Sequence, residues 1–254
     1  AIGSIICNTA LIAALTVAIR PGPVDTKALK TPVLFFFGSA AIYVINAYVT
    51  GYFGRPLGIL LLAIFVVYLV VTVRQGFKNP AGAAAEEAEA VEEEAAKNSM
   101  VKDILLLVIG AALVAVGADL LVDNGTLIAQ ALGVPESVIA LTFVALGTSL
   151  PELVTAITSL VKGCSDLSLG NIVGANVFNL VLVSGVSVTL APFTIPQNST
   201  IAGMNASLVM DIPVMFAVML LLTLPALIKG KLSRPQGIAL LCIYAAFCAI
   251  QFTM

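Results

Sequence analysis

The sequence predicts an all-α integral membrane protein built as an inverted repeat. Hydrophobic residues make up 60% of the 254 residues, charged residues only 10%, and the mean hydropathy is +1.09. A soluble domain of this length could not bury so much apolar surface. A short polar pattern also recurs in both halves of the chain. We expect an inverted five-plus-five helix repeat with the first two helices missing, which leaves eight spans in this chain.

Apolar runs near twenty residues mark the spans, because about 20 helical residues cross the hydrocarbon core of a bilayer. We expect them at 1–19, 33–53, 57–74, 101–122, 136–161, 168–191, 206–228 and 236–253. The only long polar segment is 76–100, in which six glutamates stand among alanines. Such a charge run is typical of a solvated, partly helical loop, and a calcium-sensing segment is the less favoured interpretation.

The basic residues predict the orientation. Of the twelve Lys and Arg residues, only Arg55 falls on one side of the predicted spans. The other eleven fall on the opposite side: Arg20, Lys27, Lys30, Arg74, Lys78, Lys97, Lys102, Lys162, Lys229, Lys231 and Arg234. Because cytoplasmic loops are enriched in Lys and Arg, we expect a multi-pass protein of the cell membrane with 76–100 in the cytoplasm and 123–135 outside.

An internal repeat divides the chain. Residues 3–8 align with 174–179 at an offset of 171, and 55–59 align with 234–238 at an offset of 179. We therefore expect 1–75 to be the remainder of a first repeat with three spans and 101–254 to be a second repeat with five. An odd number of spans per repeat gives the two copies opposite orientations, as in many secondary transporters.

By this symmetry the first copy lacks the counterpart of 101–171. The sequence also opens inside an apolar run at Ala1, without an initiator Met. We expect the intact protein to have ten spans, of which the first two are absent here. The alternative is an eight-span protein whose site is completed by another subunit.

The hexapeptide 147–152, Gly-Thr-Ser-Leu-Pro-Glu, places polar groups at mid-span depth. A charged residue at the bilayer centre costs about 2.5–3.5 kcal/mol on insertion scales, so Glu152 is a candidate functional residue. Pro151 removes a backbone donor and frees a carbonyl near Gly147 and Thr148. Carboxylate, hydroxyl and carbonyl oxygens are the ligands that hard cations prefer.

Other polar residues follow a helical spacing around this hexapeptide. One predicted stripe holds Thr148, Glu152, Thr155 and Ser159; a second holds Asn171, Ala175 and Asn179; a third, in the other copy, holds Ser4 and Asn8. For Thr155 and Ser159 alone we favour ordinary hydrogen bonding to the preceding turn or a neighbouring helix. Five further acids are expected at span ends: Asp119, Asp123, Glu136, Asp166 and Asp211.

Residues 144–152, Val-Ala-Leu-Gly-Thr-Ser-Leu-Pro-Glu, followed by 170–179, Gly-Asn-Ile-Val-Gly-Ala-Asn-Val-Phe-Asn, resemble the second alpha-repeat of the calcium/cation antiporter superfamily, the sodium/calcium exchangers. The resemblance covers the second half of the chain and the tail of the first repeat. It implies a ten-helix fold with four cation sites between the repeats. Glu152 would be one of two glutamates that hold calcium, and the Thr148 carbonyl a further ligand.

The resemblance also implies a sodium site formed by Ala145, Thr148 and Ser149. Ser4 and Asn8 would be the first-repeat counterparts of Ala175 and Asn179. Two residues depart from the family pattern. Many members have serine in place of Ala175, and some prokaryotic members have aspartate in place of Asn179. The amide at this second position is also found in proton-coupled relatives and leaves the coupling ion open.

We therefore expect a secondary active transporter that exchanges Ca²⁺ for Na⁺ by alternating access at a central oxygen-ligand site. A proton/calcium antiporter on the same fold is the alternative, with a cation channel less favoured. The absence of histidine disfavours a haem or a histidine-ligated zinc site. We expect no enzymatic activity, no cofactor and no nucleic-acid partner; the partners are membrane lipid and the transported ions.

Overall fold

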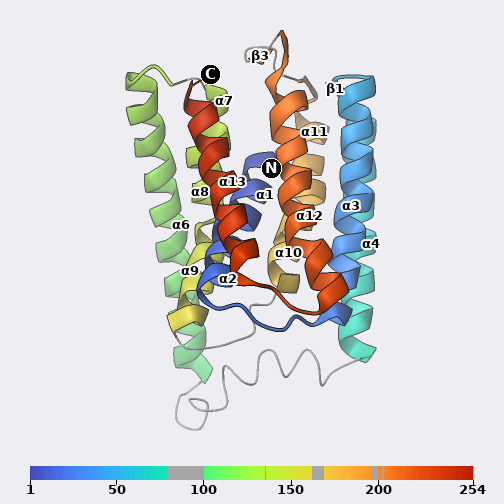
Figure 1. The fold of residues 1–254 in the computed structure, drawn as a ribbon, viewed down its shortest axis with the longest axis vertical. Helices are drawn as coiled ribbons and strands as arrows, with labels where there is room; N and C mark the ends of the chain where they lie inside the picture. Colours follow the sequence, from blue (N-terminus) through green and yellow to red (C-terminus); the bar gives the residue numbers. More distant parts are fainter. Residues whose placement is uncertain (79–99, 135, 162–168, 196–199, 202, 254) are drawn as a thin grey trace.

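Long helices run side by side through the molecule in the computed structural model (Figure 1). The structure describes residues 1–254 except 79–99, 135, 162–168, 196–199, 202 and 254. Among these described residues, seven helices are long and apolar enough to cross a membrane, or eight if the bent pair Ala140–Thr148 and Leu150–Val161 is counted as one span. This arrangement confirms the predicted all-α membrane fold and its eight spans.

The first three spans follow one another closely along the chain. The span Ile2–Ile19 consists of α1 (Ile2–Cys7), the π-helical turn η1 (Asn8–Ala13) and α2 (Ala14–Ile19). It is followed by α3 (Thr26–Val49), the short strand β1 (Tyr52–Phe53) and α4 (Arg55–Lys78). In the span Ile2–Ile19, 72% of the residues are buried, so this apolar helix lies inside the bundle rather than at its lipid-facing edge.

The second half begins with α6 (Met100–Ala131), at the edge of the bundle (Figure 1). The broken span comprises α7 (Glu136–Ile139), η2 (Ala140–Val144), α8 (Ala145–Thr148) and α9 (Leu150–Val161). The next consists of α10 (Leu169–Val177), η3 (Phe178–Val183) and α11 (Ser184–Leu190). Strands β2 (Phe193–Thr194), β3 (Thr200–Ile201) and β4 (Met204–Asn205) precede η4 (Ser207–Asp211), α12 (Ile212–Lys229) and α13 (Arg234–Thr253).

Two predicted boundaries were wrong. The span expected at 33–53 begins at Thr26, because the Asp25 carboxylate caps the helix by accepting the backbone N–H groups of Lys27 and Ala28. The loop expected at 123–135 is helical as far as Ala131. That helix ends only where Gly133 adopts a left-handed conformation, with φ of 75°.

The predicted acidic loop 76–100 falls almost wholly outside the described residues, which omit 79–99. Its two ends belong to helices, since α4 extends through Lys78 and α6 begins at Met100.

The internal repeat appears as a two-fold relation between opposite ends of the bundle. Tyr52 pairs with Thr194 between β1 and β2, and Pro23 pairs with Lys231 in an isolated antiparallel bridge. The repeat relates these two pairs, because the offset of 171 matches Pro23 with Thr194 and the offset of 179 matches Tyr52 with Lys231. Figure 1 shows β1 at one end of the bundle and the chain that follows α2 at the other. The two copies therefore run in opposite directions, as the odd number of spans predicted.

Helix packing obeys the same relation. Gly58 of α4 lies against α11, where an added Cβ would come within 2.8 Å of the Thr189 backbone nitrogen. Gly237 of α13 lies against α2, where a Cβ would come within 2.5 Å of the Ala18 backbone nitrogen. The two contacts are equivalent in the repeat, since the offset of 179 matches Gly58 with Gly237 and the offset of 171 matches Ala18 with Thr189. Each copy thus contributes a glycine that lets its last described helix closely approach the corresponding helix of the other copy, α11 for Gly58 and α2 for Gly237.

Candidate functional site

The helix break at Ser149 positions the acidic residue of the site. Helices α8 and α9 meet there at an angle of 56°. Pro151 is the second residue of α9, where its missing N–H costs no helical hydrogen bond, and Glu152 lies in the first turn, near the positive end of the helix dipole. The prediction that the proline interrupts the span is confirmed.

The single helical stripe expected from Thr148 to Ser159 is wrong, because the break places Thr148 and Glu152 on different helices. Thr155 is exposed, and its hydroxyl donates to the Glu152 carbonyl at 2.9 Å. For Thr155 alone we expected an ordinary hydrogen bond to the preceding turn or a neighbouring helix, and this bond to the preceding turn agrees with that expectation.

Helix α1 of the first copy packs against this break. The Ser4 Oγ lies 2.9 Å from Thr148 Oγ1, and the Thr148 hydroxyl donates to the Ala145 carbonyl at 3.0 Å. A Cβ on Gly3 would lie 2.9 Å from the Leu141 carbonyl oxygen and 3.0 Å from the Ala145 Cβ. The absence of a side chain at position 3 therefore allows the close approach that joins the two copies through the Ser4–Thr148 pair.

Three buried oxygens at this contact have no hydrogen-bond partner. Among the described residues, four buried side-chain polar atoms are unpaired: Asn8 Oδ1, Ser149 Oγ, Glu152 Oε2 and Ser39 Oγ. The first three belong to residues that the sequence placed in the site. Because an unsatisfied buried polar group costs about 1–3 kcal/mol, three such acceptors on neighbouring segments need a shared explanation.

Cys7 connects these groups. The Cys7 thiol lies beside the Ser149 hydroxyl, in a geometry that leaves this hydroxyl without a hydrogen bond, and close enough to Glu152 for electrostatic interaction. The next residue along the chain is Asn8, which is fully buried. Segments α1–η1 and α8–α9 thus bring an amide, a hydroxyl and a carboxylate to one region of the bundle interior.

This ligand set differs from a conventional carboxylate or histidine cluster. Within the described part of the chain, no three His, Cys, Asp or Glu side chains come together as a metal site. The set instead combines one carboxylate with neutral amide and hydroxyl oxygens. Such oxygen ligands suit hard cations such as Ca²⁺ and Na⁺, and a single negative charge would hold them less tightly than several.

Asn176 contacts a candidate site residue, and the sequence analysis missed it. The Asn8 amide donates to Asn176 Oδ1 at 3.1 Å, and Asn176 is itself fully buried. The repeat alignment directed attention to Asn179, which lies half-buried in η3, and to Ala175, which lines a cavity beside α4. The repeat aligns Asn176 with Ile5, so the comparison of the two copies did not single out Asn176. The feature that could have indicated it is a polar amide within an apolar span.

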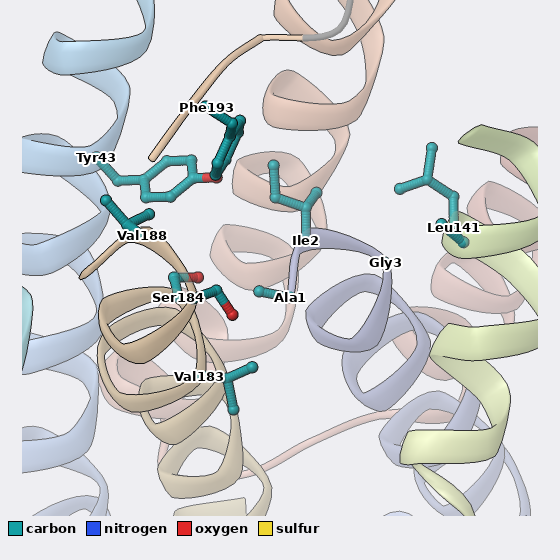
Figure 2. A pocket seen from close by; sticks show the side chains of 11 residues that line it. Ala1, Ile2, Gly3, Tyr43, Leu141, Val183, Ser184, Val188 and Phe193 are labelled. Atoms are coloured by element: carbon teal, nitrogen blue, oxygen red, sulfur yellow. The ribbon is translucent and has the colours of Figure 1, made fainter. Parts of the chain in front are cut away.

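Two cavities lie along the span α10–η3–α11. One, of about 350 Å³, is lined by its second half, including Val183, Ser184 and Val188, together with Tyr43 of α3 (Figure 2). The other, of about 370 Å³, is lined by its first half and by Pro32 of α3. Pro32 and Tyr43 are separated by roughly 16 Å along α3, at about 1.5 Å per residue. The two cavities therefore lie at different depths in the bundle.

The acids expected at span ends have different surroundings. Asp119 and Asp123 are exposed but lie inside α6 rather than at its end, and the side chains of Glu136 and Asp166 lie outside the described residues. Asp211, expected at an interface or a helix N-terminus, is only 3% exposed. Its Oδ1 accepts a 2.6 Å hydrogen bond from the Gln251 amide of α13, because packing of α13 against η4 supplies a polar partner.

Replacing Gln251 by leucine is expected to lower the thermal stability of the protein. The change removes the Gln251 donor from the buried Asp211 carboxyl and leaves it only the hydrogen bond with Ser207, at a cost of about 1–3 kcal/mol. Thermal unfolding in detergent measures the effect, and Gln75→Leu is the control because Gln75 bonds to Thr31 at an exposed position. Equal melting temperatures for Gln251→Leu and wild type would show that the buried pair contributes nothing to stability.

The chain is similar to a known protein family and to several of its relatives. Residues 1–74 and 102–253 match the family described as sodium/calcium exchanger protein. The chain is 33% identical over 260 aligned positions to the putative antiporter CaxA of Alkalimonas amylolytica, covering all of this chain and 76% of that protein. It is 30% identical over 159 positions to the sodium/calcium exchanger MaX1 of Methanosarcina acetivorans, covering 63% of this chain and 43% of that protein.

A solved structure shares the fold. The sodium-calcium exchanger NCX_Mj, soaked with Na⁺ and Sr²⁺, matches with a TM-score of 0.70 and 31% sequence identity, over 98% of this chain and 74% of that chain. The chain thus spans less than half of the Methanosarcina relative and about three quarters of the solved exchanger.

Proposed function

Because the chain belongs to the sodium/calcium exchanger family, whose members are membrane transporters, we propose that it exchanges Ca²⁺ for Na⁺ across the membrane. The proposed cation ligands are the unpaired oxygens of Asn8, Ser149 and Glu152. Thr148, Ser4, Ala145, Ala175 and Asn179 complete the proposed set of site residues. Ca²⁺ and Na⁺ compete for the same oxygens, so one ion must leave before the other binds.

The observation that carries this proposal is that Asn8, Ser149 and Glu152, on segments that pack together, each have a buried side-chain oxygen without a hydrogen-bond partner. A cation at this position would accept electron density from all three oxygens and remove the energetic penalty that they otherwise impose. A purely structural role would instead require donors from neighbouring helices. Glu152 Oε2 has no such donor among the described residues.

Alternating access is the proposed mode of transport. Support comes from the two cavities at different depths along α10–η3–α11, which would give ions separate approaches to the site. The inverted repeat supplies two structurally equivalent halves, and rocking of one half against the other is the usual motion of such folds. Glu152 without a cation is a buried charge, so the empty carrier is costly to reorient.

We also propose that the end of the bundle where Pro23 pairs with Lys231 faces the cytoplasm. Lys27 and Lys30 lie near the start of α3 at this end, whereas Arg55 begins α4 at the opposite end. The excess of basic residues at one end favours its cytoplasmic location in the cell membrane. The acidic segment 76–100, which follows α4, would lie on the same side, and the proposed domain division remains 1–75, 76–100 and 101–254.

Ion gradients imposed on proteoliposomes test the coupling ion. With pH clamped, an outward Na⁺ gradient is expected to drive Ca²⁺ uptake, and collapse of that gradient should reduce uptake to background. With Na⁺ absent on both sides, a pH gradient should drive none. Uptake driven by the pH gradient alone would instead identify a proton/calcium antiporter, the function to which the amide at Asn179 also points.

A further inference from the structure

Four fully buried side chains form a hydrogen-bonded chain between three helical segments. Asn8 and Thr9 come from η1, Asn176 from α10 and Met219 from α12. The Thr9 hydroxyl donates to the Met219 sulfur at 3.2 Å, and the Asn176 amide donates to Thr9 Oγ1 at 2.8 Å and to the Met219 sulfur at 3.3 Å. The Asn8 amide donates to Asn176 Oδ1 at 3.1 Å.

The thioether at one end favours one direction for the bonds in this chain, because only in that direction does the sulfur receive donors from both Thr9 and Asn176. The Met219 sulfur carries no hydrogen and can only accept. Thr9 gives its single hydroxyl hydrogen to the sulfur, so its oxygen must accept from the NH₂ group of Asn176. The carbonyl of Asn176 is then left to face Asn8, and Asn8 must present its own NH₂ group. The Asn8 oxygen is consequently the atom that remains at the other end.

That oxygen is the buried Asn8 Oδ1 that has no hydrogen-bond partner. If both amides rotated by 180°, Asn176 Oδ1 would accept from the Thr9 hydroxyl, and the Met219 sulfur would lose both of the donors that it has in this structure. Asn8 would then present two N–H groups in place of the oxygen. An N–H group repels a cation, whereas an amide oxygen binds one. The polarity of the chain therefore decides whether Asn8 can serve as a cation ligand.

We propose that Met219 and Thr9 are positioning residues that act through Asn176 to hold the Asn8 oxygen toward the transported cation. This inference rests on the proposed function, because it assigns Asn8 to the cation site. The residues lie behind Asn8 and need not touch the ion. Outer partners of this kind fix the orientation of a ligand, and their loss typically costs about 10–100-fold in metal affinity.

The decisive variants are Met219→Leu and Thr9→Val in the full-length protein, assayed for Ca²⁺ uptake in proteoliposomes. Each removes one polar atom at nearly constant volume. We expect each to raise the KM for Ca²⁺ by about 10-fold or more, with a smaller effect on the maximal rate. Thr9→Ser keeps the hydroxyl and should restore the wild-type KM. Met215→Leu, at a fully buried position one turn away on α12, is the matched control and should leave the KM unchanged.

A second measurement separates orientation from packing. In an Asn8→Asp background both side-chain oxygens are acceptors, so the Met219→Leu change should no longer raise the KM. A packing defect would persist in that background. Thermal unfolding without Ca²⁺ identifies any variant that fails to fold, and the Thr9→Val and Thr9→Ser pair still tests the inference if Met219→Leu does not fold.

An unchanged KM in both Met219→Leu and Thr9→Val would overturn the inference while leaving the exchanger function intact. Absence of gradient-driven Ca²⁺ uptake by the wild-type protein would instead overturn the proposed function. A KM raised equally by Met215→Leu and Met219→Leu would reduce the effect to core packing and also refute the positioning role.

Discussion

Replacing Glu152 by glutamine is expected to abolish Ca²⁺ uptake while leaving the protein folded. The change keeps the size of the side chain but removes the only carboxylate among the three unpaired acceptors. Loss of an outer partner alone costs about 10–100-fold in metal affinity, so loss of a charged ligand should cost at least about 100-fold. Folding should not suffer, because a neutral amide is cheaper to bury than a carboxylate.

Uptake of radioactive Ca²⁺ into proteoliposomes measures this loss, and thermal unfolding of the purified variant checks the fold. Asp119→Asn is the matched control, since it neutralises an exposed acid on α6 in the same way. Near-normal uptake by Glu152→Gln would remove the glutamate from the transport mechanism.

The substitutions Gly237→Ala and Gly58→Ala are expected to destabilise the fold by similar amounts. A Cβ at position 237 would lie 2.5 Å from the Ala18 nitrogen and 2.8 Å from the Ala14 carbonyl oxygen. These are backbone atoms, which cannot rotate away, so the helices must separate. Overpacking of this kind costs about 1–3 kcal/mol or more.

The corresponding loss for Gly58→Ala follows from the two-fold relation, because its Cβ would meet the backbone of α11. Melting temperatures in detergent compare both variants with Gly38→Ala, where nothing lies within 4 Å of the added Cβ and helix propensity favours alanine by about 0.5–1 kcal/mol. A melting temperature for Gly237→Ala at or above that of wild type would contradict the close packing of α13 on α2.

The features that sequence patterns predicted well are those set by local chemistry. Eight apolar runs correspond to eight spans, since burial in lipid demands about 20 apolar residues whatever the tertiary contacts. The helix break just before Pro151 was predictable because proline is tolerated in the first turn of a helix but not in its interior. The inverted repeat was readable because short segments at the same places in the two copies keep similar residues. Glu152 became a candidate site residue because a charged side chain is costly in an apolar span.

The features that could not be predicted depend on contacts between distant segments. Asp211 and Gln251 are separated by 40 residues, and nothing near either one indicates that α13 packs against η4. Asn176 faces Asn8 across 168 residues, and the repeat pairs it with an isoleucine. The polar residues from Asp123 onward suggested that the helix ends there. In the structure α6 continues to Ala131 and ends near Gly133, whose φ is positive.

The central claim is that Asn8, Ser149 and Glu152 together hold the transported cation. A crystal structure of the protein grown with Ca²⁺, with a long-wavelength anomalous difference map, tests it most directly. We predict a calcium peak about 2.3–2.6 Å from a Glu152 carboxylate oxygen, with Asn8 Oδ1 turned toward it. A calcium peak elsewhere in the bundle, with Glu152 hydrogen-bonded to a neighbouring helix or directed at lipid, would contradict the account.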